Sequence, residues 1–256
     1  MKQNNIFAIA QLLQQHELFA FNSRTLADLL ALSKVQVSQL LNRMEAAGLV
    51  ACVERGKYLL LGLSPELVLS NPFFIGGSLV SPAYISFWSG LHYYGFTEQA
   101  PQTTFIATTQ HKPRLTFRQL QFQFVTLPPG AFFGYQRVQL AGLPVVIADE
   151  QKIILDCLLF PQWCGGITEI AKGLKNSLEQ LDLDLLVEYA NQLHNPSLGS
   201  RLGFLLETLG KPVEGLAIAQ GPISLDASKP KSGVYHRRWR IYTNLSPSDL
   251  FPQGVM

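Results

Sequence analysis

The stretch SKVQVSQLLNRMEAAGLV (residues 33–50) decides how the first part of the chain folds. Val37, Leu41 and Met44 recur at spacings of four and three residues, which places them on one face of a helix. Ser33 precedes this pattern and can cap the helix, because a serine hydroxyl accepts a hydrogen bond from a backbone N–H of the first turn. The pattern therefore predicts one capped amphipathic helix.

The neighbouring segments complete a known order of elements. Working outward, we expect a helix over residues 6–15, a helix capped by Ser23, the helix described above ending near Ala47 before Gly48, and two strands over residues 49–53 and 57–61 joined by a turn at 54–56. Helix, helix, tight turn, helix and β-hairpin is the order of a winged helix-turn-helix domain. We expect that domain over residues 1–65.

The face of the third helix that points away from its apolar residues is polar and basic. Gln and Asn side chains can pair with adenine edges, while Arg and Lys suit guanine or phosphate. The candidate DNA-binding residues are Ser33, Lys34, Gln36, Ser38, Gln39, Asn42 and Arg43 on the helix, and Arg55 and Lys57 on the hairpin. We expect a double-stranded DNA operator, an inverted repeat bound by a homodimer. A winged helix used only for protein contacts is the alternative.

Composition and charge narrow the class of protein. The chain has 256 residues, of which 47% are apolar and 15% charged, so it is too hydrophobic for a disordered chain. Its net charge of +2 lies entirely in residues 1–65, and the remainder is neutral. No apolar run reaches 18 residues, which excludes a transmembrane helix and predicts no membrane partner. Three widely spaced cysteines without a C-x-x-C pair favour the reducing cytoplasm.

The rest of the chain predicts a connector and a larger α+β domain. Three prolines and a Gly-Gly pair make residues 64–82 irregular, so we place the connector within this stretch, at residues 66–81. Residues 82–256 form the second domain, in which strands precede most helices. The expected elements are a helix over 82–94, strands over 103–108, 121–126, 137–140 and 143–148, a helix from Asp149 to Leu159, helices over 168–175, 183–193 and 200–209, and a strand over 239–243.

A second group of cations lies near the C-terminus. Within twelve residues that contain no acid stand Lys229, Lys231, Arg237, Arg238 and Arg240. Such clusters mark nucleic-acid or partner surfaces. A solvated loop that leads into a strand explains the same residues, and the two interpretations stay open.

The best catalytic candidate is the segment Asp149-Glu150-Gln151-Lys152 at the end of a predicted strand. An acid and a lysine placed there could hold a metal and a phosphate, as in endonuclease cores. A helix start explains them more simply: Asp149 caps the helix, Lys152 faces water, and Asp156 lies one turn further on. Arg201 or Arg238 could pair with Asp156, or could equally bind an anionic ligand or the phosphate backbone. The histidines have no metal-ligand spacing, so we expect no catalytic residue, no cofactor and no metal.

Several segments carry a resemblance to a known family. They are YISFWSGLHYYGFTEQAP (84–101), VVIADEQKIILDCLLFP (145–161), GGITEIAKGL (165–174), SRLGFLLETLG (200–210) and RRWRIYTNL (237–245). In this order they resemble the AbiEi family, the antitoxins and predicted viral-defence transcriptional regulators of abortive-infection type IV toxin–antitoxin systems. The resemblance implies autorepression through the winged helix. It also implies a second domain that counteracts a nucleotidyltransferase-like toxin without a stable complex.

The sequence thus predicts a cytoplasmic, non-enzymatic transcriptional regulator with two domains. The neutral second domain departs from the more basic one of many such regulators. Two alternatives remain: a nucleic-acid-processing enzyme that the winged helix targets to its substrate, and a one-component regulator whose aromatic second domain senses a small ligand.

Overall fold

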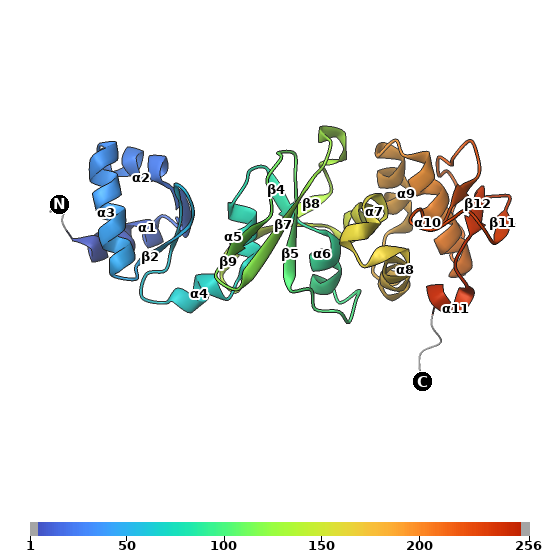
Figure 1. Ribbon diagram of the computed structural model, residues 1–256, viewed down its shortest axis with the longest axis horizontal. Coiled ribbons are helices and arrows are strands. Elements are labelled where there is room, and N and C mark those ends of the chain that lie inside the picture. The colour runs from blue at the N-terminus through green and yellow to red at the C-terminus, as the bar shows by residue number, and fades with distance from the viewer. Residues whose placement is uncertain (1–4, 252–256) are drawn as a thin grey trace.

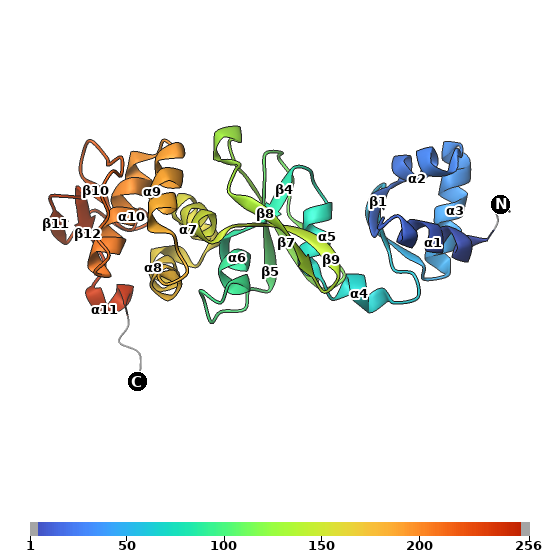
Figure 2. The same cartoon turned by 180° about the vertical axis from the view of Figure 1, so that it is seen from behind.

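The computed structural model describes residues 5–251 and has an α+β fold. Figures 1 and 2 show three groups of elements in a row. The N-terminal group lies at one end, a group built around a large sheet lies in the middle, and the C-terminal helices and a small sheet form the other end. No helix within residues 5–251 is long and apolar enough to cross a membrane.

The N-terminal group has the predicted order of helices and hairpin strands, with one strand added. Its elements are α1 (Ile6–Gln15), β1 (Ala20–Asn22), α2 (Ser23–Leu30), α3 (Lys34–Ala46), β2 (Val50–Glu54) and β3 (Lys57–Leu60). The added strand, β1, pairs with β3 in an antiparallel sheet of order β1-β3-β2. The predicted cap of α2 was wrong by one residue: Asn22 accepts the hydrogen bond from the Thr25 backbone N–H, and Ser23 is already helical.

Helix α3 follows the sequence pattern closely. Ser33 is its N-cap, and the side chain of Gln36 reaches back to the Ser33 backbone N–H, which completes a capping box. Val37, Leu41 and Met44 are buried against the rest of the N-terminal group. Gly48, just past the helix, has a φ of +70°, a left-handed conformation that favours glycine.

The segment predicted as an irregular connector contains two helices, α4 (Pro65–Leu69) and α5 (Pro72–Ser78). Proline stands at the first position of each, where its missing N–H costs nothing. Phe74 and Ile75 of α5 are buried in a cluster that also contains Leu59 and Leu61 from the hairpin side of the N-terminal group. The prolines and glycines therefore belong to short packed helices rather than to an extended linker.

The middle group is built on a sheet with the order β6-β7-β5-β4-β9-β8. Its strands are β4 (Ala83–Ile85), β5 (Thr103–Thr108), β6 (Leu115–Phe117), β7 (Leu120–Thr126), β8 (Tyr135–Leu140) and β9 (Leu143–Ala148), with the short helices α6 (Phe87–Tyr93) and η1 (Pro129–Ala131) between them. Both faces of the sheet are covered: Ile85 and Ile106 belong to the same cluster as α5, and Tyr84 and Phe105 to the cluster of α6 and the C-terminal helices.

The helix predicted over residues 82–94 was therefore wrong in its first part. Residues 83–85 form β4, which pairs with β5 and β9, and only residues 87–93 are helical. A strand that is buried on both faces has no polar alternation, so its apolar run can be mistaken for the apolar face of a helix.

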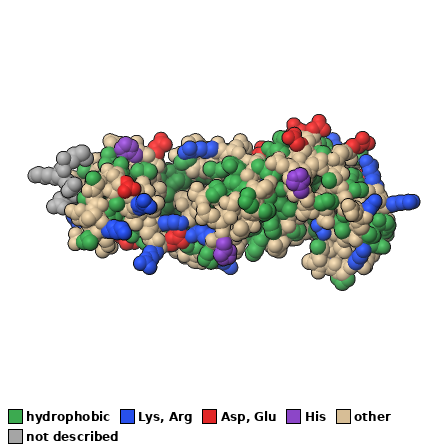
Figure 3. All heavy atoms as spheres, turned by 90° about the horizontal axis from the view of Figure 1, so that it is seen from above, with side chains coloured by type: hydrophobic (Ala, Val, Ile, Leu, Met, Phe, Trp, Pro, Cys, Tyr) green, Lys and Arg blue, Asp and Glu red, His purple; other side chains and the backbone are tan. Residues whose placement is uncertain are grey.

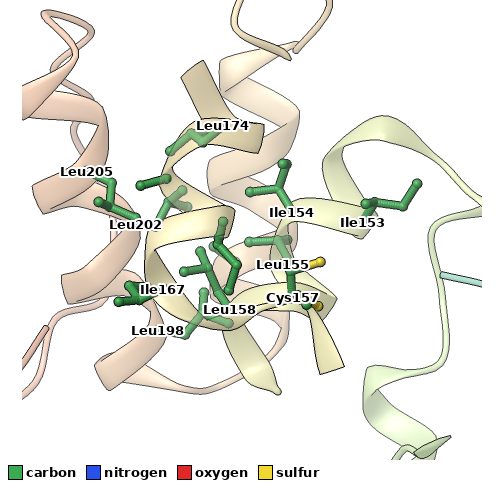
Figure 4. Close-up of a cluster of buried hydrophobic side chains, with 14 of the residues drawn as sticks. Ile153, Ile154, Leu155, Cys157, Leu158, Ile167, Leu174, Leu198, Leu202 and Leu205 are labelled. Atoms are coloured by element: carbon green, nitrogen blue, oxygen red, sulfur yellow. The ribbon is translucent and has the colours of Figure 1, made fainter. Parts of the chain in front are cut away.

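The C-terminal group consists of helices that pack around α7, and of a small sheet. Its elements are α7 (Glu150–Leu159), η2 (Pro161–Trp163), α8 (Gly166–Ser177), α9 (Leu183–Gln192), α10 (Pro196–Thr208), β10 (Ile223–Ser224), β11 (Val234–His236), β12 (Ile241–Thr243) and α11 (Pro247–Leu250). Figure 4 shows Leu158 of α7 beside Ile167 of α8 and Leu198 of α10 in one apolar cluster. The small sheet has the order β10-β12-β11.

Candidate nucleic-acid interface

The outer face of α3 is polar, and most of the predicted DNA-binding residues lie on it. The side chains exposed on this face are those of Lys34, Ser38, Gln39, Asn42 and Arg43, beside the exposed N-cap Ser33. No acidic residue interrupts this face before Glu45. The opposite face buries its apolar residues, so the helix can present only this side to a partner.

Gln36 is exposed but already has partners in the structure. Its Oε1 accepts hydrogen bonds from the backbone N and the Oγ of Ser33, both at 2.9 Å. A glutamine that pairs with an adenine needs the same oxygen and its amide N–H groups together. In the structure, the side chain of Gln36 therefore caps the N-terminus of α3.

A cleft of about 700 Å³ separates α2 and α3 from the turn between β2 and β3. Three cations from three different elements line it: Arg24 of α2, Lys34 of α3 and Arg55 of the hairpin turn. Asp28 lines it as well. Convergent cations on a concave surface raise the local concentration of anions. We call Arg24, Lys34 and Arg55 the cleft cations.

Arg24 was absent from the predicted site. It stands in the first turn of α2, and only the packing of α2 against α3 and the hairpin brings it close to Lys34 and Arg55. The sequence offered one signal, namely that Arg24 is one of only six Lys and Arg residues in the net-positive N-terminal quarter.

Lys57 lies on the other side of the hairpin, toward the middle group. Its ammonium forms an ion pair with Glu54 at 2.7 Å and donates a hydrogen bond to the Leu79 carbonyl. Lys112, from the loop before β6, forms a second ion pair with Glu54 at 2.7 Å. Partial burial raises the pKa of the Glu54 carboxyl, but the hydrogen bonds from Lys112 and Lys57 outweigh it and hold that pKa below its ordinary value. The hairpin is thereby fastened to the middle group.

Replacing Lys112 by alanine will lower the free energy of unfolding by about 1 kcal/mol, because the ion pair with Glu54 is only partly exposed. The effect has a defined pH dependence. A carboxyl whose pKa is lowered by folding stabilises the folded state above its ordinary pKa, and the contribution is lost as the pH falls through the lowered value. Chemical unfolding at several pH values measures it. Lys172→Ala, which removes a half-exposed lysine whose ammonium is 3.7 Å from the Glu169 carboxylate, is the control. If the two substitutions lower the free energy of unfolding equally, the ion pair between Lys112 and Glu54 makes no special contribution to stability.

The C-terminal basic cluster is divided among several local contacts. Arg238 forms an ion pair with Glu207 at 2.9 Å, and Arg240 donates to the Gln220 carbonyl. Lys231 donates to the Pro222 carbonyl at 3.0 Å and lies over the Tyr242 ring. Lys229 and Arg237 are exposed. Figure 3 shows Lys and Arg side chains at the end of the molecule that carries β11 and β12.

Lys152 does not face water, contrary to our expectation. It is fully buried and forms an ion pair with Asp156, which is also fully buried. Asp156 additionally accepts hydrogen bonds from the Ser86 hydroxyl at 2.7 Å and the Tyr84 hydroxyl at 3.1 Å. Burial raises the pKa of Asp156, while Lys152 and the two hydroxyl groups oppose that rise. Tyr84 and Phe133 lie around the Lys152 ammonium as ring contacts.

Asp149 and Arg201 also have structural partners. Asp149 caps α7 as predicted, accepting a hydrogen bond from the Lys152 backbone N–H at 2.8 Å. The expectation that Arg201 or Arg238 pairs with Asp156 was wrong. Asp156 pairs with Lys152, whereas Arg201 donates to the carbonyls of Ser224 and Leu225, and Arg238 pairs with Glu207. Within residues 5–251, no three His, Cys, Asp or Glu side chains are grouped to hold a metal ion.

Comparisons with known proteins show similarity of fold. No family model matches the chain. A solved structure, the RV2827C protein from Mycobacterium tuberculosis, is similar with a TM-score of 0.55 at 10% identity, and the similarity covers 93% of this chain and 91% of that one. A part of the chain is 34% identical over 92 residues to the E3 ubiquitin-protein ligase RNF19B of Mus musculus. That match covers 34% of this chain and 13% of the ligase, so the chain spans a small part of that relative.

Proposed function

We propose that this protein is a DNA-binding transcriptional regulator of the cytoplasm. The order of α1, α2, α3 and the β2–β3 hairpin is that of a winged helix-turn-helix domain, in which the second helix of the pair enters the major groove. The observation that carries the proposal is the exposed polar face of α3 beside a cleft lined by the cleft cations. DNA offers the matching surface, with polar base edges in a groove and phosphates along its rims.

In this proposal the two kinds of contact have separate roles. Gln39 and Asn42 on α3 contact base edges, and the cleft cations contact the phosphates on either side of the groove. Arg43 lies further along the same helix face. Lys57 and Gln36 are not part of the proposed surface, because Lys57 is engaged with Glu54 and Gln36 with Ser33. A homodimer on an inverted repeat is the expected assembly.

The test is salt-dependent binding of the full chain to its own promoter fragment and to a scrambled duplex of equal length. We expect promoter-selective binding whose affinity falls on the order of 10³-fold or more between 50 and 200 mM salt for about six phosphate contacts. A lack of selectivity at every salt concentration would overturn the proposal. A winged helix used for protein contacts, or an enzyme targeted to nucleic acid, would then be the function to test.

Replacing Gln39 by alanine will weaken promoter binding by about 1–3 kcal/mol and relax specificity at the base pair it contacts. Binding to the scrambled duplex will change little, because no phosphate contact is lost. Fluorescence anisotropy with both duplexes measures the two effects. Gln192→Ala, at the C-terminal end of α9, is the matched control. An equal loss of affinity for both duplexes would contradict the proposed contact between Gln39 and a base edge in the major groove.

We extend the proposal to the rest of the chain on the basis of the AbiEi resemblance. In this extended proposal, residues 82–256 of the chain counteract a nucleotidyltransferase-like toxin without forming a stable complex with it. Co-expression of the full chain with a neighbouring gene of that class, where one exists, is the test: growth rescue without co-purification is expected. If growth is not rescued, the proposed antagonism of a toxin fails, and the proposed DNA-binding function is unaffected.

A further inference from the structure

We propose that Val35 determines sequence specificity by contacting the C5-methyl group of a thymine in the major groove. This inference rests on the DNA-binding function proposed above and adds a residue to its site. It concerns an apolar side chain that stands on the polar face of α3, where the sequence pattern predicts only polar residues as DNA contacts.

The exposure of Val35 separates it from the other apolar residues of the helix. Val35 is 67% exposed, whereas Val37 is 2% and Leu40 is 5% exposed. It is the second residue of α3, next to Lys34, which lines the cleft. In helix-turn-helix proteins the N-terminal residues of this helix are those that contact base edges. Its position, and not its exposure alone, therefore points to the groove.

The capping box strengthens this assignment. Gln36 bonds to Ser33, so the first turn of α3 leaves the side chains of Lys34 and Val35 to meet the groove. Val35 is also one helical turn before Gln39, and residues four apart are neighbours on a helix surface. Val35 and Gln39 therefore form a continuous strip that can follow neighbouring base pairs.

The chemistry of valine selects its partner. Valine has no hydrogen-bonding group, and among the base edges of the major groove the thymine methyl is the apolar group. Contact between the two removes apolar surface from water on both sides. Cytosine, adenine and guanine lack this methyl group, so none of them offers the valine the same apolar contact.

The test compares the promoter fragment made with thymine with the same fragment made with uracil, which lacks the methyl group and keeps the base pairing. The wild-type chain will bind uracil DNA about fourfold more weakly for each methyl contact, which corresponds to about 0.8 kcal/mol. In Val35→Ala the ratio of the two affinities will fall to about one. Because Val35 is exposed, this variant will keep the thermal unfolding midpoint of the wild type. Leu63→Ala removes another exposed apolar side chain and will keep the wild-type ratio.

The outcomes separate this inference from the function on which it rests. If the wild-type chain binds neither fragment in preference to a scrambled duplex, the proposed function fails. If it binds the promoter selectively but equally well with thymine and uracil, the inference alone is overturned. The same holds if Val35→Ala keeps the full preference for thymine, because another residue then contacts the methyl group.

Discussion

Replacing Lys152 by alanine will lower the free energy of unfolding by about 3–5 kcal/mol, because it leaves the buried carboxylate of Asp156 without its counter-ion. Removal of the ammonium raises the pKa of Asp156 further, so that the folded variant favours the protonated carboxyl. The loss will therefore grow as the pH rises above the ordinary pKa of an aspartate. Chemical unfolding followed by circular dichroism, at acidic and neutral pH, measures both effects.

Two variants serve as controls for this substitution. The double variant Lys152→Met/Asp156→Leu removes both charges at similar volume and will recover part of the stability, since a buried ion pair often contributes little over a well-packed apolar pair. The recovery will be incomplete, because the buried hydroxyl groups of Ser86 and Tyr84 lose their acceptor. Lys172→Ala removes an exposed lysine from the neighbouring helix α8 and will change stability by less than about 1 kcal/mol. A loss of that small size for Lys152→Ala would contradict the buried pair.

Removing the three cleft cations together will weaken DNA binding about 100- to 500-fold at 0.1 M salt for each bound copy, as expected if each loses one phosphate contact. In Arg24→Ala/Lys34→Ala/Arg55→Ala, the slope of log affinity against log salt will become shallower by about 2 to 3. The loss will be similar on promoter and scrambled DNA, because phosphate contacts carry no sequence information. Titrations of both duplexes across a range of salt concentrations measure the slope.

The matched control removes the same number of charges elsewhere. Lys172, Lys175 and Lys211 lie on or just after the C-terminal helices α8 and α10, far along the molecule from α3 (Figure 1). Their replacement by alanine will leave the slope almost unchanged. If this control lowers affinity as much as the cleft variant does, binding depends on overall charge and the cleft has no special part in it.

Local signals made α3 predictable from the sequence. Its cap, its apolar spacing and its terminal glycine all lie within residues 33–48, and the structure confirms each of them. The sequence also contains the spacing of a capping box, because Gln36 stands three residues after Ser33. Gln36 was nevertheless predicted to contact DNA, since the same side chain suits both purposes.

Features that depend on distant segments could not be predicted. The enclosure of Lys152 requires Tyr84 from β4 and Phe133 from the loop after η1, and nothing near Lys152 in the chain signals their approach. The i, i+4 spacing of Lys152 and Asp156 predicted their contact but not its burial. β4 was missed for a related reason: a three-residue strand takes its identity from the strands on either side of it.

The capping box of α3 has a consequence for the thermodynamics of association. Because the hydrogen bonds between Ser33 and Gln36 already order the first helical turn in the free protein, the backbone beneath Lys34 and Val35 has little conformational entropy to lose on binding. The entropic penalty at this end of the helix is then confined to side-chain rotamers, about 0.5–1.5 kcal/mol for each one immobilised. The first turn of α3 is therefore ordered when the protein folds, and it is preorganised before a ligand binds.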